Sequence, residues 1–470
     1  MKYLLYYNLD SEFVNDQTAC GGDGSNVVSV VDGVAFAWTD GHMNDERVYY
    51  RYAKPNDTGS VTSYTVTVHY TDSVGKTLAQ DDVYTVDTYI GKSAKFFIAP
   101  KSIENYVPIK SGVSVTVSSN TEYNLIYRKD RKEMLNKPLT FNVISSGTIS
   151  WVASNASFRK AIYYSKNGGS WSSITSNTSS SAPAISVSAG DSIQFKGDNA
   201  AYATSSYFTY FSASTGTKFS VEGNIMSLIN STGFSTATTL QTTYTFSYLF
   251  NNCDKLIRGL DLVLPATTLG DYCYNYMFHG CKGLTSAPEL PATTLANYCY
   301  SDMFDGCTSL TAAPALPATT LANNCYYDMF YNCTSLTTAP ELPATTLANG
   351  CYSSMFAGCT SLTTAPELPA TTLANGCYSS MFHGCKGLTS APELPATTLA
   401  QSCYQYMFQS CTNLNYIKCL ATNRSATYCT ADWVSGVQTT SGTFVKNPAM
   451  SSWSTGNSGI PNNWTVQNAS

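Results

Sequence analysis

Charged residues and histidine are scarce in this chain. Charged side chains make up 12% of the 470 residues, about half the usual share, and only four histidines occur. The formal net charge of −5 offers no basic surface for nucleic acid or for an anionic membrane. The sequence also lacks a glycine-rich phosphate loop, His-Glu-x-x-His and Gly-x-Ser-x-Gly. We therefore predict no catalytic residues, no cofactor and no nucleic-acid partner.

Long apolar runs are absent as well. No stretch is long enough to cross a bilayer, so we expect no membrane insertion. Residues 1–10 begin like a signal peptide, but Asn8 and Asp10 interrupt the apolar run and no small-residue cleavage site follows. We expect the protein to be assembled in a cytoplasm, although it could still act outside a cell.

Cysteine is abundant but lacks the spacing of a metal site. Of 16 cysteines only Cys20 lies outside the repeats described below, and no Cys-x-x-Cys occurs. His279 and His383 lie near cysteines, yet other copies hold Asp305, Tyr331, Ala357 or Gln409 at that position. Paired cysteines eight residues apart would lie about 12 Å apart on a helix, beyond disulfide reach. We predict free, buried thiols and no metal.

The second half of the chain is a repeat with a period of 26 residues. Leu-Pro-Ala-Thr-Thr-Leu begins at Leu264, Leu290, Leu316, Leu342, Leu368 and Leu394. A fixed period of this size is typical of a solenoid, in which each unit buries its apolar side against its neighbours. Degenerate copies flank the regular ones, so we predict a solenoid over residues 223–440 and a C-terminal cap over residues 441–470.

One copy shows a pattern that favours a helix followed by a strand-like arm. In the copy that starts at Leu290, Thr293 or Thr294 can cap a helix that runs from Leu295 to Phe304. Apolar residues at i, i+4 and i+8 would give it one buried face. Leu310 then leads into a short extended piece. The expected fold of each repeat is therefore α/β.

The first half predicts β-rich modules. Residues 1–57 hold two apolar runs joined by Asp32-Gly33, a hairpin signal in a small module that we expect to dock to a partner. Residues 58–133 alternate in polarity, with Tyr64, Val66 and Val68 on one face and Thr65, Thr67 and His69 on the other. Residues 134–222 hold short strands separated by glycine turns, which is typical of a β-sandwich.

Two resemblances to known families follow from these residues. The repeat pattern resembles BspA-like leucine-rich repeats of surface proteins from gut Bacteroidetes and their phages, and it is carried by Leu290, Pro291, Leu295, Cys299, Tyr300, Met303, Phe304, Cys307 and Leu310 and their equivalents. The order Tyr-x-Asp-x-x-Gly-Lys-x-Leu, then Ile-x-x-Tyr, within residues 58–133 resembles MucBP-like modules. The first resemblance implies adhesion and partner binding, and the second implies a β-grasp-like fold.

Binding would use residues that vary from copy to copy. Tyrosine and aspartate at these positions suit a glycan or a protein, because tyrosine offers a flat apolar face with a hydroxyl group. The same residues could also be only the solvated side of each repeat. The candidate ligand-binding residues are Tyr272, Tyr276, Tyr298, Asp302, Tyr327, Asp328, Tyr331 and Tyr406.

Three functions remain open from the sequence. The first is a non-enzymatic phage virion appendage of the tail- or head-fibre type, with residues 1–57 bound to other virion proteins and the repeats bound to the host surface. The second is a bacterial BspA-like adhesin on the cell surface. The third is a glycan-degrading enzyme with its catalytic residues in 136–222. A homo-oligomer is possible, but no heptad pattern predicts one.

Overall fold

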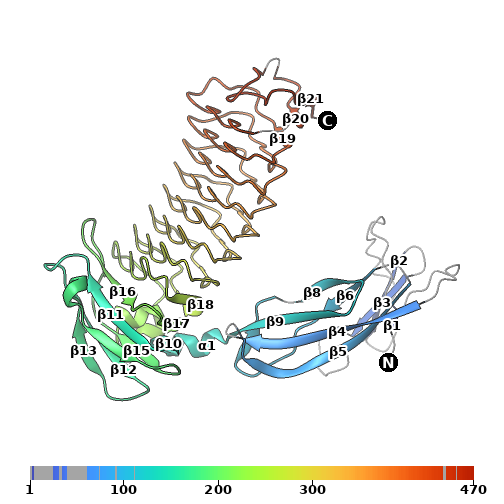
Figure 1. The fold of residues 1–470 in the computed structure, drawn as a ribbon. Helices are drawn as coiled ribbons and strands as arrows, with labels where there is room; N and C mark the ends of the chain where they lie inside the picture. Colours follow the sequence, from blue (N-terminus) through green and yellow to red (C-terminus); the bar gives the residue numbers. More distant parts are fainter. Residues whose placement is uncertain are drawn as a thin grey trace. The chain divides into compact units, whose positions relative to one another are not determined.

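The computed structural model describes residues 61–72, 75–89, 93–110, 112–437, 441–450 and 453–469, together with the backbone of three short strands that precede them. The chain divides into two compact units, 1–130 and 131–470 (Figure 1). The structure is rich in strands and poor in helices. The finer domain boundaries expected from the sequence stay predictions.

Unit 1 is built from strands around a small apolar core. A five-stranded sheet has the order β1-β5-β4-β9-β7, and the strand pairs β2-β3 and β6-β8 form two separate two-stranded sheets. The predicted hairpin before residue 57 is confirmed, because β2 pairs antiparallel with β3. The strands are β1 (Tyr3–Leu4), β2 (Ser25–Val30), β3 (Val34–Thr39), β4 (Val61–Asp72), β5 (Thr77–Tyr89), β6 (Ala94–Ile98), β7 (Tyr106–Pro108), β8 (Val113–Val117) and β9 (Thr121–Lys129).

The alternation predicted for residues 64–69 is present in β4. Val66 and Val68 are fully buried, and Tyr64 packs against the same core. Thr65, Thr67 and His69 lie on the other side of the strand and are less buried. One face of the five-stranded sheet therefore covers the core of unit 1, and the opposite face carries polar side chains.

Unit 2 begins with the short helix α1 (Arg131–Asn136) and two sheets. Phe211 of the smaller sheet contacts Phe141 and Phe195 of the larger one, with ring centroids 4.8 Å apart in both pairs. The larger sheet has the order β13-β12-β15-β10-β17-β18 and the smaller β14-β11-β16. Their strands are β10 (Leu139–Ser145), β11 (Gly147–Ala153), β12 (Ala161–Lys166), β13 (Ser172–Thr175), β14 (Ala184–Val187), β15 (Ser192–Lys196), β16 (Thr209–Ala213), β17 (Lys218–Asn224) and β18 (Leu256–Val263).

The repeats form a stack of coils, visible from yellow-green to red in Figure 1. Short 3-10 helices η1 (Ser179–Ser181), η2 (Ile225–Leu228) and η3 (Phe234–Thr236) precede them, and β19 (Tyr416–Cys419), β20 (Thr443–Lys446) and β21 (Thr465–Asn468) close the far end as a parallel sheet. Within the central coils the predicted strand-like arm is reduced to isolated bridges such as Ala312–Thr338.

The helix predicted in each repeat is wrong. In the copy that starts at Leu290, Tyr298, Asp302 and Gly306 have positive φ values of 55°, 56° and 69°. A left-handed residue at every fourth position ends each helical turn, and the segment is instead a series of four-residue turns. The amide of Met303 donates to Tyr300 O within its own turn, at 3.2 Å. The spacing of four between apolar residues is compatible with the helical period of 3.6, but in the structure it is the length of these turns.

Alternate amides leave the turn and bind the next coil. Tyr300 N donates to Cys325 O at 3.0 Å, and Phe304 N donates to Met329 O at 3.0 Å. The same register repeats in coil after coil, so equivalent residues stack on one another. Phe304 lies 5.5 Å from Phe278 with an interplanar angle of 1°. A left-handed conformation costs a residue other than glycine about 1–2 kcal/mol, and these hydrogen bonds and ring stacks offset it.

One apolar core runs through the whole of unit 2, from Leu139 to Trp464. At the first end β17 pairs in parallel with β18, and Phe211 stacks on Phe250 with centroids 5.7 Å apart. At the last end Trp433 covers Tyr404, with centroids 6.3 Å apart. The two ends of the ring columns are thus covered by the upstream sheets and by tryptophan.

Fifteen cysteines among the described residues are free and buried, as predicted; Cys20 lies outside those residues. Burial raises the pKa of the Cys253 thiol to about 12, which removes the reactive thiolate at neutral pH. We expect native protein to react slowly with a thiol reagent, and denatured protein to titrate close to 16 thiols. A count near zero after unfolding without reductant would overturn this assignment.

The substitution Gly376→Ala distinguishes left-handed turns from a helix, because the two structures predict opposite changes in stability. Gly376 lies inside the predicted helical segment, has a φ of 60°, and a Cβ added there would meet no atom within 4 Å. In a helix Gly376→Ala would stabilise the protein by about 1 kcal/mol, whereas in a left-handed turn it should destabilise it by about 1–2 kcal/mol. Urea unfolding measures the difference. A gain in stability would restore the helical interpretation.

Candidate functional site

The left-handed positions form columns on the outside of the stack. The first column, in which one residue comes from each coil, comprises Tyr244, Tyr272, Tyr298, Asn324, Gly350, Gly376, Ser402 and Tyr428. The second column comprises Tyr248, Tyr276, Asp302, Asp328, Ser354, Ser380, Tyr406 and Asp432. Six of the eight predicted binding residues occupy these two columns. The other two, Tyr327 and Tyr331, immediately precede a left-handed residue, Asp328 and Asn332 respectively.

Tyrosine rings in these columns stack on one another at the first end of the repeats. Tyr272 lies between Tyr244 and Tyr298, with centroids 4.7 and 4.8 Å away and interplanar angles of 10° and 5°. In the second column Tyr276 stacks on Tyr248 at 4.8 Å. The structure therefore brings Tyr272, Tyr276 and Tyr298 into two neighbouring ring ladders.

Two aspartates follow the ladder in the second column. Asp302 is 6% exposed, and the Ser301 hydroxyl donates to its Oδ2 at 2.5 Å. The hydroxyl groups of Tyr327 and Ser354 bind Asp328, whose Oδ1 is buried and has no hydrogen-bond partner among the described residues. Adjacent coils are hydrogen-bonded neighbours, so the two carboxyl groups are one coil, about 4.8 Å, apart.

These carboxyl groups resist ionisation. Burial raises the pKa of Asp302 to about 6, and the Asp305 carboxylate adds to this shift. Burial, followed by repulsion from Asp302, raises the pKa of Asp328 to about 7. Their charge also acts on tyrosine: burial and then Asp328 raise the pKa of Tyr327 to about 12. The two carboxyl groups therefore ionise at a higher pH than ordinary aspartates, close to neutrality.

His279 and Tyr331 border the same region. His279 Nε2 lies 3.3 Å from Asp305 Oδ2, and its Nδ1 lies 2.8 Å from Asn251 Oδ1. Tyr331 is 38% exposed. Tyr406 stands apart from the rest of the predicted set, because three coils, about 14 Å, separate it from Asp328.

Comparison with known proteins assigns the repeats. Residues 204–337, 246–371 and 323–432 match the family described as the BspA type leucine-rich repeat region, in six copies. Residues 204–432 therefore consist of BspA-type leucine-rich repeats. No curated protein and no solved structure matches the chain. The comparisons do not show the MucBP-like module, which stays a prediction. BspA-type repeats form a non-enzymatic repeat family, and proteins that carry them are typically at the cell surface or secreted.

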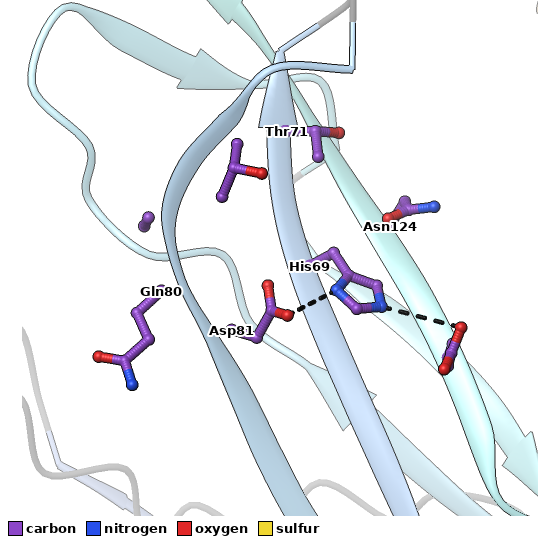
Figure 2. A pocket seen from close by; sticks show the side chains of 8 residues that line it. His69, Thr71, Gln80, Asp81 and Asn124 are labelled. Atoms are coloured by element: carbon purple, nitrogen blue, oxygen red, sulfur yellow. Dashed lines mark hydrogen bonds and ion pairs between the residues drawn. The ribbon is translucent and has the colours of Figure 1, made fainter.

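A second polar site lies on unit 1, outside the BspA-type repeats. His69 of β4 is flanked by carboxylates from β5 and β9, with Nδ1 2.8 Å from Asp81 Oδ2 and Nε2 4.0 Å from Glu122 Oε2 (Figure 2). These three side chains line a hollow together with Thr71, Thr77, Ala79, Gln80 and Asn124. The alternation in the sequence predicts His69 on the outer face of its strand. It does not predict the pairing of β4 with β5 and β9, which brings the two carboxylates to the histidine.

Asp81 and Asp82 are adjacent in the sequence but bind different side chains. Asp81 contacts His69, whereas Asp82 Oδ1 accepts a hydrogen bond from Lys101 Nζ at 2.6 Å. Across the described part of the chain, no group of three or more His, Cys, Asp or Glu residues is arranged to hold a metal ion. In the same residues no helix is long and apolar enough to span a membrane.

The aspartate pair makes stability depend on pH. Because folding raises the pKa of Asp328 from 3.8 to about 7, the neutral carboxyl stabilises the fold at low pH, and this contribution is lost as pH rises through that interval. Asp328→Asn keeps a residue that tolerates the left-handed conformation and removes the titration. At roughly pH 8 we expect it to stabilise the protein by about 1–2 kcal/mol, a value reduced because the carboxyl is partly solvated.

Chemical unfolding across the pH range checks this prediction. The variant should lose the decline in stability that the unchanged protein shows between acid and neutral pH. Glu367→Gln, at an exposed position of the repeats, should leave that decline intact. Equal slopes for Asp328→Asn and the unchanged protein would contradict the assignment.

Proposed function

We propose that this protein is a non-enzymatic adhesion protein that binds a surface glycan or protein through the two outer columns of its BspA-type repeats. One observation carries the proposal. The cysteine, methionine and phenylalanine residues common to the copies are buried in the stack, and the exposed Thr-Thr pair is the same in each copy, so we assign selective recognition to the residues that change from copy to copy. Those residues are mainly tyrosine, aspartate, asparagine and serine at the left-handed positions.

A more specific form of the proposal is a phage virion appendage of the tail- or head-fibre type. In it, residues 1–57 dock to other virion proteins and a β-grasp-like, MucBP-like module over residues 58–133 serves as a spacer. A β-sandwich over residues 134–222 covers the first end of the repeat solenoid. The repeats then contact the host surface. This form rests on the sequence expectations alone. A bacterial cell-surface adhesin is the second candidate, and the usual location of BspA-like proteins favours it.

Binding of labelled full-length protein to whole cells tests the proposal. Tyr327→Ala combined with Tyr331→Ala removes two ring side chains beside the columns, and we expect it to weaken binding at least about tenfold, or about 1.4 kcal/mol. Tyr163→Ala is the matched control, because Tyr163 is 46% exposed and lies on β12 outside the columns. It should bind like the unchanged protein.

The choice of cells and particles separates the two forms. Binding to bacteria and detection of the chain in purified virions by mass spectrometry support the virion appendage. Binding to animal epithelial cells, with the chain recovered from bacterial surfaces, supports the bacterial adhesin. Binding to no cell type, or equal losses for the double variant and the Tyr163 control, would contradict the proposed function.

A further inference from the structure

The tyrosine ladder of the first column leaves one ring face uncovered. Tyr272 is stacked on both faces, by Tyr244 and by Tyr298. Tyr298 is stacked on one face only, because the next residue of the column is Asn324 and not a ring. A planar ligand therefore has no access to the faces of Tyr272, whereas it can reach the second face of Tyr298.

The residues beyond Tyr298 leave room beside that face. The Asn324 carboxamide is directed away from Tyr298: its Oδ1 occupies the place where a Cβ on Gly350 would stand. At Gly376, one coil further, an added Cβ would meet no atom within 4 Å. Over three successive coils the side chain of the first column therefore becomes smaller, from the phenol ring of Tyr298 to the amide of Asn324 and then to the bare backbone of Gly350.

Polar groups lie next to this step in the column. Asn324 presents a carboxamide, and Tyr327 presents a hydroxyl group bound to Asp328. Asp328 Oδ1 is buried and has no hydrogen-bond partner among the described residues. An aromatic face with an amide, a hydroxyl and a carboxyl group beside it offers both the apolar contact and the orienting hydrogen bonds that small ligands require.

We propose that the uncovered face of Tyr298, together with Asn324, Tyr327 and Asp328, binds one pyranose ring of a neutral glycan. The inference rests on the proposed adhesive function and names its ligand class. The C–H face of the sugar ring stacks on Tyr298, and its hydroxyl groups bind the three polar side chains. Above about pH 7, where Asp302 and Asp328 ionise, their carboxylates disfavour sialylated or sulfated glycans, because like charges repel.

An array of neutral hexose and N-acetylhexosamine oligosaccharides, printed beside their sialylated counterparts, tests the inference with full-length protein. We expect binding to neutral members, a loss of at least tenfold for Tyr298→Ala, and near-normal binding for Tyr298→Phe. Tyr163→Ala is the binding control, because Tyr163 is 46% exposed and lies on β12, outside both columns. Tyr272→Ala is the stability comparison, because it removes two ring stacks where Tyr298→Ala removes one.

If Tyr298 only supported the fold, Tyr272→Ala would be the more harmful change. We expect Tyr298→Ala to lose more glycan binding than Tyr272→Ala, a change within about threefold for Tyr163→Ala, and melting curves that show all three variants folded. An array without neutral binders, or equal losses for Tyr298→Ala and Tyr272→Ala, would overturn the inference.

Treated cells separate this inference from the proposed function. Cell binding that survives removal of surface glycans and is lost after protease treatment identifies a protein partner, which overturns the glycan site and leaves adhesion standing. Failure to bind any cell type would overturn both the glycan site and the proposed adhesive function. Loss of binding after glycan removal, and not after protease treatment, supports the site at Tyr298.

Discussion

The hydrogen bond from one coil to the next is the interaction on which the rest of unit 2 depends. Alternate amides of each turn, such as those of Tyr300 and Phe304, donate to carbonyl groups one coil further along the chain. This direction of bonding requires a left-handed residue at every fourth position, since a continuous helix would direct all amides along its own axis. The register it imposes then places equal side chains on top of one another. Ring columns, buried thiols and outer columns all follow from it.

Stacking of equal residues has opposite consequences inside and outside the coils. Inside, Phe278 meets Phe304 and Tyr274 meets Tyr300 in nearly parallel pairs that are buried in the core. In the second column Asp302 and Asp328 lie one coil apart; burial raises the pKa of both, and repulsion from Asp302 adds to the shift of Asp328. Equal residues at equivalent positions of adjacent coils therefore stabilise the core. At the surface equal charged residues would destabilise the contact between coils, so the residues there vary.

Much of this architecture was predictable because it depends on period and burial. The period of 26, the BspA-type assignment and the buried cysteines followed from the sequence. The helix did not, because apolar residues at i, i+4 and i+8 fit both a helix and a series of four-residue turns. Asp302 and Gly306 at fourth positions are turn residues, but Tyr298 conceals the signal, since a bulky residue seldom adopts a left-handed conformation. The ring ladder at Tyr272 and the Asp302–Asp328 pair could not be predicted from the sequence, because both depend on the register between coils.

Tyrosine at a left-handed position needs a physical reason, because asparagine or glycine adopts that conformation at lower cost. For Tyr272 the reason is local, since stacking on two neighbouring rings offsets the strain. Tyr428 has a φ of 56° and is 64% exposed, so its ring is mostly in solvent rather than held by packing. Strain without compensating burial is a property of sites shaped by function rather than by folding. Packing within the stack therefore does not explain the left-handed conformation of Tyr428, whereas the partner contact proposed above would.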